Sequence, residues 1–454
     1  MKKLVYYILA FSLLPSMGCD DWLDVKPSNR VEEEEMFSSE SGFQNALTGA
    51  YITLKDEGLY GRTLTMDFTE NLAQHWNVEP QSASDYVRKF KYDEAGVEAT
   101  KDGIYAALYK NIAYVNNILT FAENGVLSEN MYHFIKGEAL GLRAYMHLDL
   151  LRLFGPVPGN QSSGKMLTYA RELSRENLEV NTWEEYIAYL EKDLDEAERL
   201  LAGVEDKGIK DDFLTYRQNR MNYYAVMATK ARFYLWTQNK AKAGEYANKV
   251  IASKRFRLAD SQEFTDKDFI ASKEHIFSVH VFDLQELTEN YFYRAGGISQ
   301  NQKLIEQDLF GGDPTDIRKA ELWKSFKESA GSRFVLMKYK QGDAIVSSRE
   351  QVPLIRLYEM YLIAIECSDD PSVYQPLIDE LLLARNMSLD MANASISKKN
   401  EFVAKEYNKE FYGEGQQFYQ YKRRNDSSIL WTDIQGSDKV YVLPIPKNEI
   451  KYGE

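Results

Sequence analysis

Cysteine is scarce in this chain of 454 residues, which contains only Cys19 and Cys367. The two could form one disulfide, but Cys367 lies in the apolar run LIRLYEMYLIAIEC, whose spacing is helical. That setting favours a buried free thiol at Cys367. The fold must therefore be stabilised by its core, and a chain of this length can bury a large one.

Basic residues are fewer than acidic ones. The chain has 55 lysines and arginines and 69 aspartates and glutamates, for a net charge of −14. Such a chain repels phosphate backbones, and no basic stripe offsets the repulsion. We therefore expect no nucleic-acid partner.

Catalytic and metal-binding patterns are missing as well. The sequence has no nucleophile elbow, phosphate loop or HExxH motif. His275 and His280 lie five residues apart on a predicted strand, on opposite faces, which argues against a shared metal. Glycan hydrolysis requires two positioned carboxylates, and among 69 acidic residues no pair stands out. We expect no enzymatic activity, no cofactor and no catalytic metal. Whether the chain binds a structural calcium ion is left open.

The one long apolar run before the body lies at the N-terminus. Lys2 and Lys3 precede apolar residues 4–14, which are too few to span a bilayer. This layout is typical of a secretory signal peptide. With small residues before Cys19, it resembles a bacterial lipoprotein signal, which implies a signal peptide over residues 1–18.

The same resemblance implies that Cys19 is acylated and anchors the chain to a membrane. Asp20 and Asp21 resemble the surface-export signal of Bacteroidetes lipoproteins. Residues 19–36 would then be a lipidated tether. The alternative is a cleaved signal peptide followed by an incidental cysteine.

The remaining residues, 37–454, predict a single body built mainly of helices. The clearest repeat lies at residues 221–253, where two short helices meet through alanines in a unit of about 34 residues, the tetratricopeptide arrangement. We divide the body into a helical part (37–255), an irregular part (256–345) and a C-terminal helical part (346–454).

Residues 137–158 predict the helix around which the body is organised. Gly137 and Gly141 fall on its apolar face. Each costs about 1 kcal/mol relative to alanine, a cost tolerated where the backbone of another helix comes close. The helix also carries a predicted polar margin, formed by Arg143, Asp149 and Arg152.

Four segments, in this order, resemble the SusD/RagB family of outer-membrane nutrient-binding lipoproteins. They are residues 19–27 (CDDWLDVKP), 143–158 (RAYMHLDLLRLFGPVP), 354–367 (LIRLYEMYLIAIEC) and 410–424 (EFYGEGQQFYQYKRR), followed by LPIP at 443–446. The third segment carries the family pattern at Arg356, Glu359, Ala364 and Glu366. At Gln416, Gln417 and Gln420 the family commonly has histidine, arginine and aspartate.

The resemblance implies a mainly α fold of tetratricopeptide-like helix pairs with a loop-rich face and a few short strands. It implies a cell-surface lipoprotein of the outer membrane of a Bacteroidetes-type bacterium. Such a protein binds an oligosaccharide and delivers it to a SusC-like TonB-dependent transporter. Some relatives bind peptides, so a RagB-like peptide-binding lipoprotein is the alternative. A glycan-degrading enzyme and a pure protein–protein scaffold are further alternatives.

A sugar site needs flat aromatic faces beside polar groups. The irregular residues 59–100 offer this mixture, and Trp76 is the foremost candidate because it lies among polar residues. The ligand candidates in this loop are Tyr60, His75, Trp76, Asn77, Tyr86 and Arg88. The irregular part 256–345, where the family also places ligand residues, adds Tyr291, Tyr293 and Trp323.

Overall fold

The computed structural model describes residues 28–452 except 175–177, 205–214, 330 and 343. The predicted signal peptide, Cys19 and the first half of the tether, residues 19–27, therefore lie outside the described residues. The first described helix is α2 (Ser28–Met36). Among the described helices, none combines the length and the apolar character that crossing a bilayer requires.

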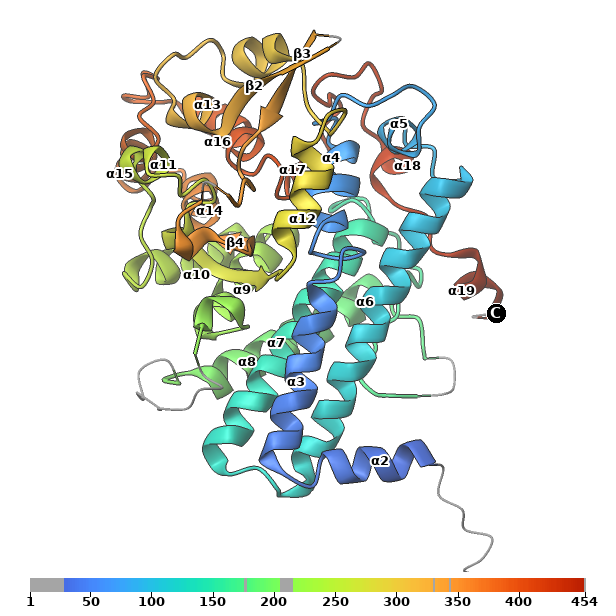
Figure 1. Cartoon of the computed structure of the whole chain (residues 1–454). Helices are drawn as coiled ribbons and strands as arrows, with labels where there is room; N and C mark the ends of the chain where they lie inside the picture. Colours follow the sequence, from blue (N-terminus) through green and yellow to red (C-terminus); the bar gives the residue numbers. More distant parts are fainter. Residues whose placement is uncertain (1–27, 175–177, 205–214, 330, 343, 453–454) are drawn as a thin grey trace, which may run out of the picture.

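Helices dominate the structure, as expected (Figure 1). Those within residues 37–255 are α3 (Glu40–Leu54), α4 (Phe68–Leu72), α5 (Ala83–Arg88), α6 (Ala95–Phe121), α7 (Glu129–Phe154), α8 (Trp183–Leu201), α9 (Tyr223–Trp236) and α10 (Lys240–Ala252). Those after residue 255 are α11 (Ser261–Thr265), α12 (Leu284–Thr288), α13 (Ile317–Leu322), α14 (Leu357–Cys367), α15 (Pro371–Ala384), α16 (Ile396–Glu410), α17 (Gln417–Arg424), α18 (Asp438–Tyr441) and α19 (Lys447–Tyr452). Successive helices pack as pairs, α7 with α8, α9 with α10 and α14 with α15, which confirms the tetratricopeptide-like body.

Two small antiparallel sheets interrupt the helices. β1 (His275–His280) pairs with β4 (Gln351–Arg356), and β2 (Trp323–Glu328) forms a hairpin with β3 (Gly331–Leu336). The irregular part 256–345 therefore contains a hairpin that the sequence pattern did not predict. Residues 59–100 are also more ordered than expected, because they include α4, α5 and the start of α6.

The predicted central helix is α7, and it is buried on all sides from Gly137 to Phe154. The predicted polar margin is therefore wrong. Arg143 is buried and donates to Asp193 of α8 at 2.7 Å. Arg152 donates to the Asp149 carboxylate and, through Nη2, to the Gln416 side-chain oxygen, both at 2.8 Å. These polar side chains of α7 are thus buried and paired, either within the helix or with α8 and Gln416.

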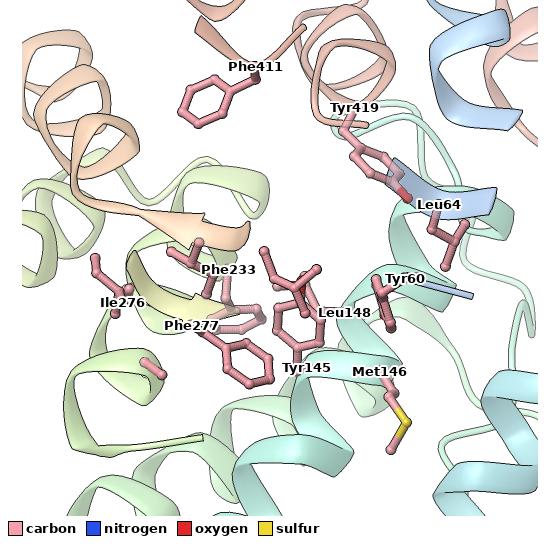
Figure 2. Packing of buried hydrophobic residues seen from close by; sticks show 14 of the residues in the cluster. Tyr60, Leu64, Tyr145, Met146, Leu148, Phe233, Ile276, Phe277, Phe411 and Tyr419 are labelled. Atoms are coloured by element: carbon pink, nitrogen blue, oxygen red, sulfur yellow. The ribbon is translucent and has the colours of Figure 1, made fainter. Parts of the chain in front are cut away.

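The two glycines of α7 make room for side chains, not for a second backbone as predicted. A Cβ at Gly137 would lie 2.7 Å from Leu201 Cγ, and one at Gly141 would lie 2.5 Å from Met221 Cγ. Figure 2 shows the neighbouring core, where Tyr145 of α7 meets Phe277 of β1 at 5.5 Å between ring centroids. α7 therefore lies at the centre of the hydrophobic core.

A buried ion cluster joins the irregular part to the C-terminal helices. It contains five carboxylates and five cationic side chains, Glu274, Asp316, Glu406, Glu410, Glu414, Arg318, Lys338, Arg356, Arg385 and Lys409. At its centre the Glu410 carboxylate accepts from Arg385 at 2.8 and 2.9 Å, from Arg356 at 2.7 Å and from Arg318 at 2.9 Å. These arginines come from three different elements, so one carboxylate fixes them together.

The charges in this cluster control its pKa values. Burial alone would raise the pKa of Glu406, but Arg318 and Lys409 lower it from the usual 4.5 to about 2. Arg385 and Arg356 likewise hold the pKa of the buried Glu410 well below 4.5. Both carboxylates are therefore ionised in the folded protein at neutral pH.

We predict that Glu410→Gln lowers the free energy of unfolding at pH 7 by about 3–5 kcal/mol, because it leaves buried arginines without a counter-charge. The folded pKa of Glu410 is depressed, so the stability contributed by the carboxylate is present above about pH 4.5 and is lost as the pH falls through the folded pKa. The stability difference between the native chain and the variant should therefore narrow below that pH, as urea unfolding can measure.

The matched control is Glu401→Gln, which removes an exposed carboxylate paired with Lys405 on the same helix. Exposed pairs contribute little, so this variant should change stability by less than about 1 kcal/mol. A Glu410→Gln deficit that stays constant from pH 7 to pH 3 would contradict the role of the ion cluster.

Candidate functional site

A polar cavity of about 520 Å³ opens among the loops. Amide side chains dominate its lining, which consists of Asn77, Ser299, Gln300, Asn301, Gln302, Lys303, Glu306, Gln307, Ser332, Arg333 and Phe334. We call this cavity the amide pocket. Its volume lies in the range of small-molecule sites. In Figure 1 the neighbouring elements α5, α17 and the β2–β3 hairpin gather at the end of the molecule opposite α2, which we call the loop-rich face.

Backbone hydrogen bonds hold the walls of the amide pocket together. Asn77 N donates to Ser299 O at 2.9 Å, and Gln300 N donates to Phe334 O at 3.0 Å. The Gln300 side chain donates to the backbone oxygen of His75 at 2.8 Å. Three segments that are distant in sequence therefore meet at this pocket in a fixed arrangement.

His75 links the wall of the amide pocket to the C-terminal segment. Its Nδ1 lies 2.6 Å from Glu70 Oε2, and its Nε2 lies 2.9 Å from Asn408 Oδ1. Glu70 also accepts from the backbone N–H groups of Gly413 and Gly415, each at 2.8 Å. Histidine and glutamate are both fully buried. His75 is therefore a structural anchor between the loop and the C-terminal segment.

Three aromatic ligand candidates are core residues in this structure. Trp76 is 0% exposed, donates from Nε1 to Met66 O at 2.8 Å and packs against Phe292. Tyr60 is buried and donates to Asp149 at 2.8 Å, and Trp323 is buried against Phe334. Together with His75, they shape the loops but offer no face to a ligand. A local sequence pattern could not show this, because their partners lie far away along the chain.

The other five candidates reach the surface to different degrees. Asn77 is exposed, lines the amide pocket, and its side-chain amide makes no hydrogen bond within the described chain. Tyr86, Arg88, Tyr291 and Tyr293 are half-buried. Tyr291 donates weakly to Met66 O at 3.3 Å, and the Lys340 ammonium lies 4.4 Å from the centre of the Tyr293 ring. Only Asn77 among the nine predicted residues lines the pocket itself.

Sequence reasoning missed Trp431, in the loop between α17 and α18. This tryptophan is half-buried, and its Nε1 donates to Asp308 Oδ2 at 3.1 Å. The signal was available, since the polar residues Thr432, Asp433 and Gln435 follow Trp431 closely. The amides at 300, 301, 302 and 307 were missed because no periodicity distinguishes them from ordinary loop residues.

A second cavity, of about 650 Å³, lies along α7 and α8. Charged side chains from both helices line it, among them Lys136, Arg143, Asp193 and Arg199. Arg143 and Asp193 are already paired with each other. In the part of the chain that the structure describes, no group of three or more histidine, cysteine, aspartate or glutamate side chains could hold a metal ion.

Comparison with known proteins relates the N-terminal half of the chain to a family. Residues 21–235 match the model of the SusD-like family described as "Starch-binding associating with outer membrane". SusD-like protein P2 of Formosa agariphila is 27% identical over 161 residues, which are 34% of this chain and 30% of that protein. SusD-like protein P38 of the same organism is 21% identical over 271 residues, 58% of this chain. These matches span between 30% and 49% of the relatives' own lengths.

Solved structures extend the likeness to nearly the whole fold. A SusD superfamily protein from Bacteroides vulgatus superposes with a TM-score of 0.73 at 21% identity, covering 91% of this chain and 97% of the other. A laminarin-binding SusD-like protein superposes with a TM-score of 0.68 at 17% identity, covering 91% and 98% of the two chains. At these identities the likeness concerns the fold.

We predict that Trp76→Ala lowers the free energy of unfolding by about 3–5 kcal/mol, since it empties a large buried site. Trp76→Phe keeps most of the packing and loses the hydrogen bond to Met66 O, so it should cost less. Urea unfolding measures both. If Trp76→Phe instead left stability unchanged and weakened ligand binding tenfold, the placement of Trp76 in the core would be wrong.

Proposed function

The chain is a member of the SusD-like family, and on that premise we propose that it is a cell-surface lipoprotein that binds an oligosaccharide. We further propose that it delivers the oligosaccharide to a SusC-like TonB-dependent transporter in the outer membrane. The family is one of carbohydrate-binding proteins. The role as a lipoprotein rests on the signal sequence and on Cys19, and the transporter partnership rests on the family resemblance.

The amide pocket is the observation that carries the proposal. An amide side chain offers two donors and an acceptor, which suits sugar hydroxyl groups that both donate and accept. Asn77 has such an amide, and it makes no hydrogen bond to any other residue that the structure describes. Phe334 adds apolar surface beside these polar groups. The chemistry of the pocket therefore fits a neutral polar ligand with many hydroxyl groups.

The number of carboxylates in the amide pocket favours binding of a glycan over its hydrolysis. Glu306 is the single carboxylate among the residues that line it, and its Oε1 accepts from Gln302 at 3.0 Å. Glycoside hydrolysis by the common mechanisms uses a pair of carboxylates across the scissile bond. The pocket provides one, so we propose capture of the glycan and not its cleavage.

We predict that the mature chain binds an oligosaccharide in calorimetry against a panel of glycans and peptides. Asn77→Ala should weaken this binding about 2- to 10-fold, because it removes one or two hydrogen bonds to sugar hydroxyls. Asn248→Ala, which removes an exposed amide on α10 far from the loops, is the control and should leave affinity unchanged. Binding to peptides with no response to any glycan would favour the RagB-like alternative and contradict the proposal.

A further inference from the structure

The π-helix η8 (Leu304–Leu309) contributes to the walls of two cavities. Gln307 lines the amide pocket, whereas the next residue, Asp308, lines a groove of about 390 Å³. Residues 308–313, residues 388–391 and one face of α16 form this groove, which we call the α16 groove. The α16 helix packs against η8 and lies at the end of the molecule opposite α2 (Figure 1). The two cavities are therefore neighbours that share one short helix.

The crest between the two cavities is open to solvent, because Gln307 and Asp308 are both exposed. Consecutive Cα atoms are about 3.8 Å apart, so the edges of the two cavities lie close together at this point. A helix with its side chains is about 10–12 Å across, which sets the length that a ligand must span to enter both. A single sugar ring is too short for that span, whereas a chain of several rings is long enough.

The α16 groove combines apolar surface with hydrogen-bonding groups. Leu389 lines it and is 40% exposed, and the buried rings of Phe310 and Phe402 form part of the lining beneath. Lys405 and Glu401 of α16 are exposed on its rim, where they pair with each other at 2.6 Å. Apolar surface beside groups that donate and accept hydrogen bonds is what a sugar site needs.

The charges in the α16 groove favour a neutral ligand. Three lysines and five carboxylates line it, an excess of two negative charges. A carboxylate on a ligand would be repelled, whereas sugar hydroxyl groups can donate to Asp308 and Glu401. An ionised carboxylate accepts several hydrogen bonds, so Asp308 can hold a neighbouring side chain and still accept from a ligand.

Trp431 adds an aromatic surface at the Asp308 end of the groove. Its Nε1 donates to Asp308 Oδ2 at 3.1 Å, and its ring centre lies 6.4 Å from that of His75, edge-on. The backbone oxygen of His75 in turn accepts from Gln300 on the wall of the amide pocket. Among the tryptophans that the structure describes, Trp431 alone is not buried. An accessible indole therefore adjoins residues of both cavities.

The backbone of Trp431 is strained as well. Its φ angle is +63°, in the left-handed region that bulky side chains rarely adopt. Such a conformation costs free energy and persists only where surrounding contacts hold it. The hydrogen bond to Asp308 is one such contact, and it fixes the indole beside η8.

We propose that the amide pocket and the α16 groove are two subsites of one binding site, which a neutral oligosaccharide fills by crossing η8 beside Trp431. One end of the chain binds the amides near Asn77, and the other packs on Leu389 and donates hydroxyl hydrogens to Asp308. The inference rests on the proposed function and narrows the ligand to an uncharged glycan of several sugar units. Two linked contacts raise affinity above that of either alone, because the second forms at a high effective concentration.

The test measures the affinity of the whole mature chain for oligomers of increasing length by calorimetry. The probes are laminarin, xylan, mannan and starch oligomers from disaccharide to octasaccharide, with galacturonate oligomers as the charged series. In a neutral series that binds, we expect affinity to rise by about tenfold or more once the oligomer is long enough to cross η8. Galacturonate oligomers should not show this rise.

Three variants locate the second subsite. Leu389→Ala should weaken binding of the long oligomer about 3- to 10-fold and leave that of the short oligomer unchanged. Trp431→Gly suits the left-handed backbone and should weaken the long oligomer by about tenfold or more, again without affecting the short one. Leu383→Ala is the matched control, because Leu383 is 81% exposed at the end of α15 and lines neither cavity, so it should change neither affinity.

Two further measurements make these results specific. Asn77→Ala should weaken short and long oligomers alike, because both fill the amide pocket. The melting temperatures of Leu389→Ala and Trp431→Gly should lie within about 4 °C of the native value, which shows that the variants are folded.

The outcomes separate the two proposals. Equal affinity for short and long neutral oligomers, or a length effect that neither Leu389→Ala nor Trp431→Gly reduces, overturns the second subsite and leaves the proposed function in place. Tighter binding of galacturonate oligomers than of any neutral series overturns the neutral ligand. Binding of peptides and of no oligosaccharide overturns the proposed function as well.

Discussion

Glu410 is the carboxylate on which arginines from three elements converge. Arg318 of α13, Arg356 of β4 and Arg385 after α15 all donate to it inside a core that excludes water. A buried charge is costly unless it is paired and hydrogen-bonded, so none of these side chains can leave the others. The irregular part of the chain, which has little periodicity of its own, is held against the C-terminal helices by this requirement.

A short series of hydrogen bonds links the buried ion cluster to the loop-rich face. Arg356 and Lys338 hold Glu414, and the flanking Gly413 and Gly415 donate their N–H groups to Glu70. Glu70 fixes His75, whose backbone oxygen receives the Gln300 side chain on the wall of the amide pocket. The segments that resembled a family in the sequence are thus largely structural. Their charged residues position the loops, which on our proposal carry the ligand site.

Periodicity predicted what depends on neighbours along the chain. The helix pair at residues 221–253 and the core position of α7 followed from the spacing of small and apolar residues. The exposure of the candidate aromatic residues did not follow, because Trp76 and Trp431 look alike in sequence and differ only in what distant segments cover them. Trp76 packs against Phe292 and Tyr412 and is fully buried. Trp431 packs edge-on against His75 and is only half-buried. The buried ion cluster was also not predicted. A charged residue in a sequence looks like a solvent-exposed one unless its partners are known.

The central claim is that the loop-rich face, and not the helix pairs, meets the ligand. Hydrogen–deuterium exchange of the mature chain with and without a saturating oligosaccharide tests it most directly. The account predicts slower exchange at residues 74–77, 299–303 and 429–432, and unchanged exchange along α7 and α8. Protection confined to the α7–α8 cavity, with the loops unaffected, would contradict it.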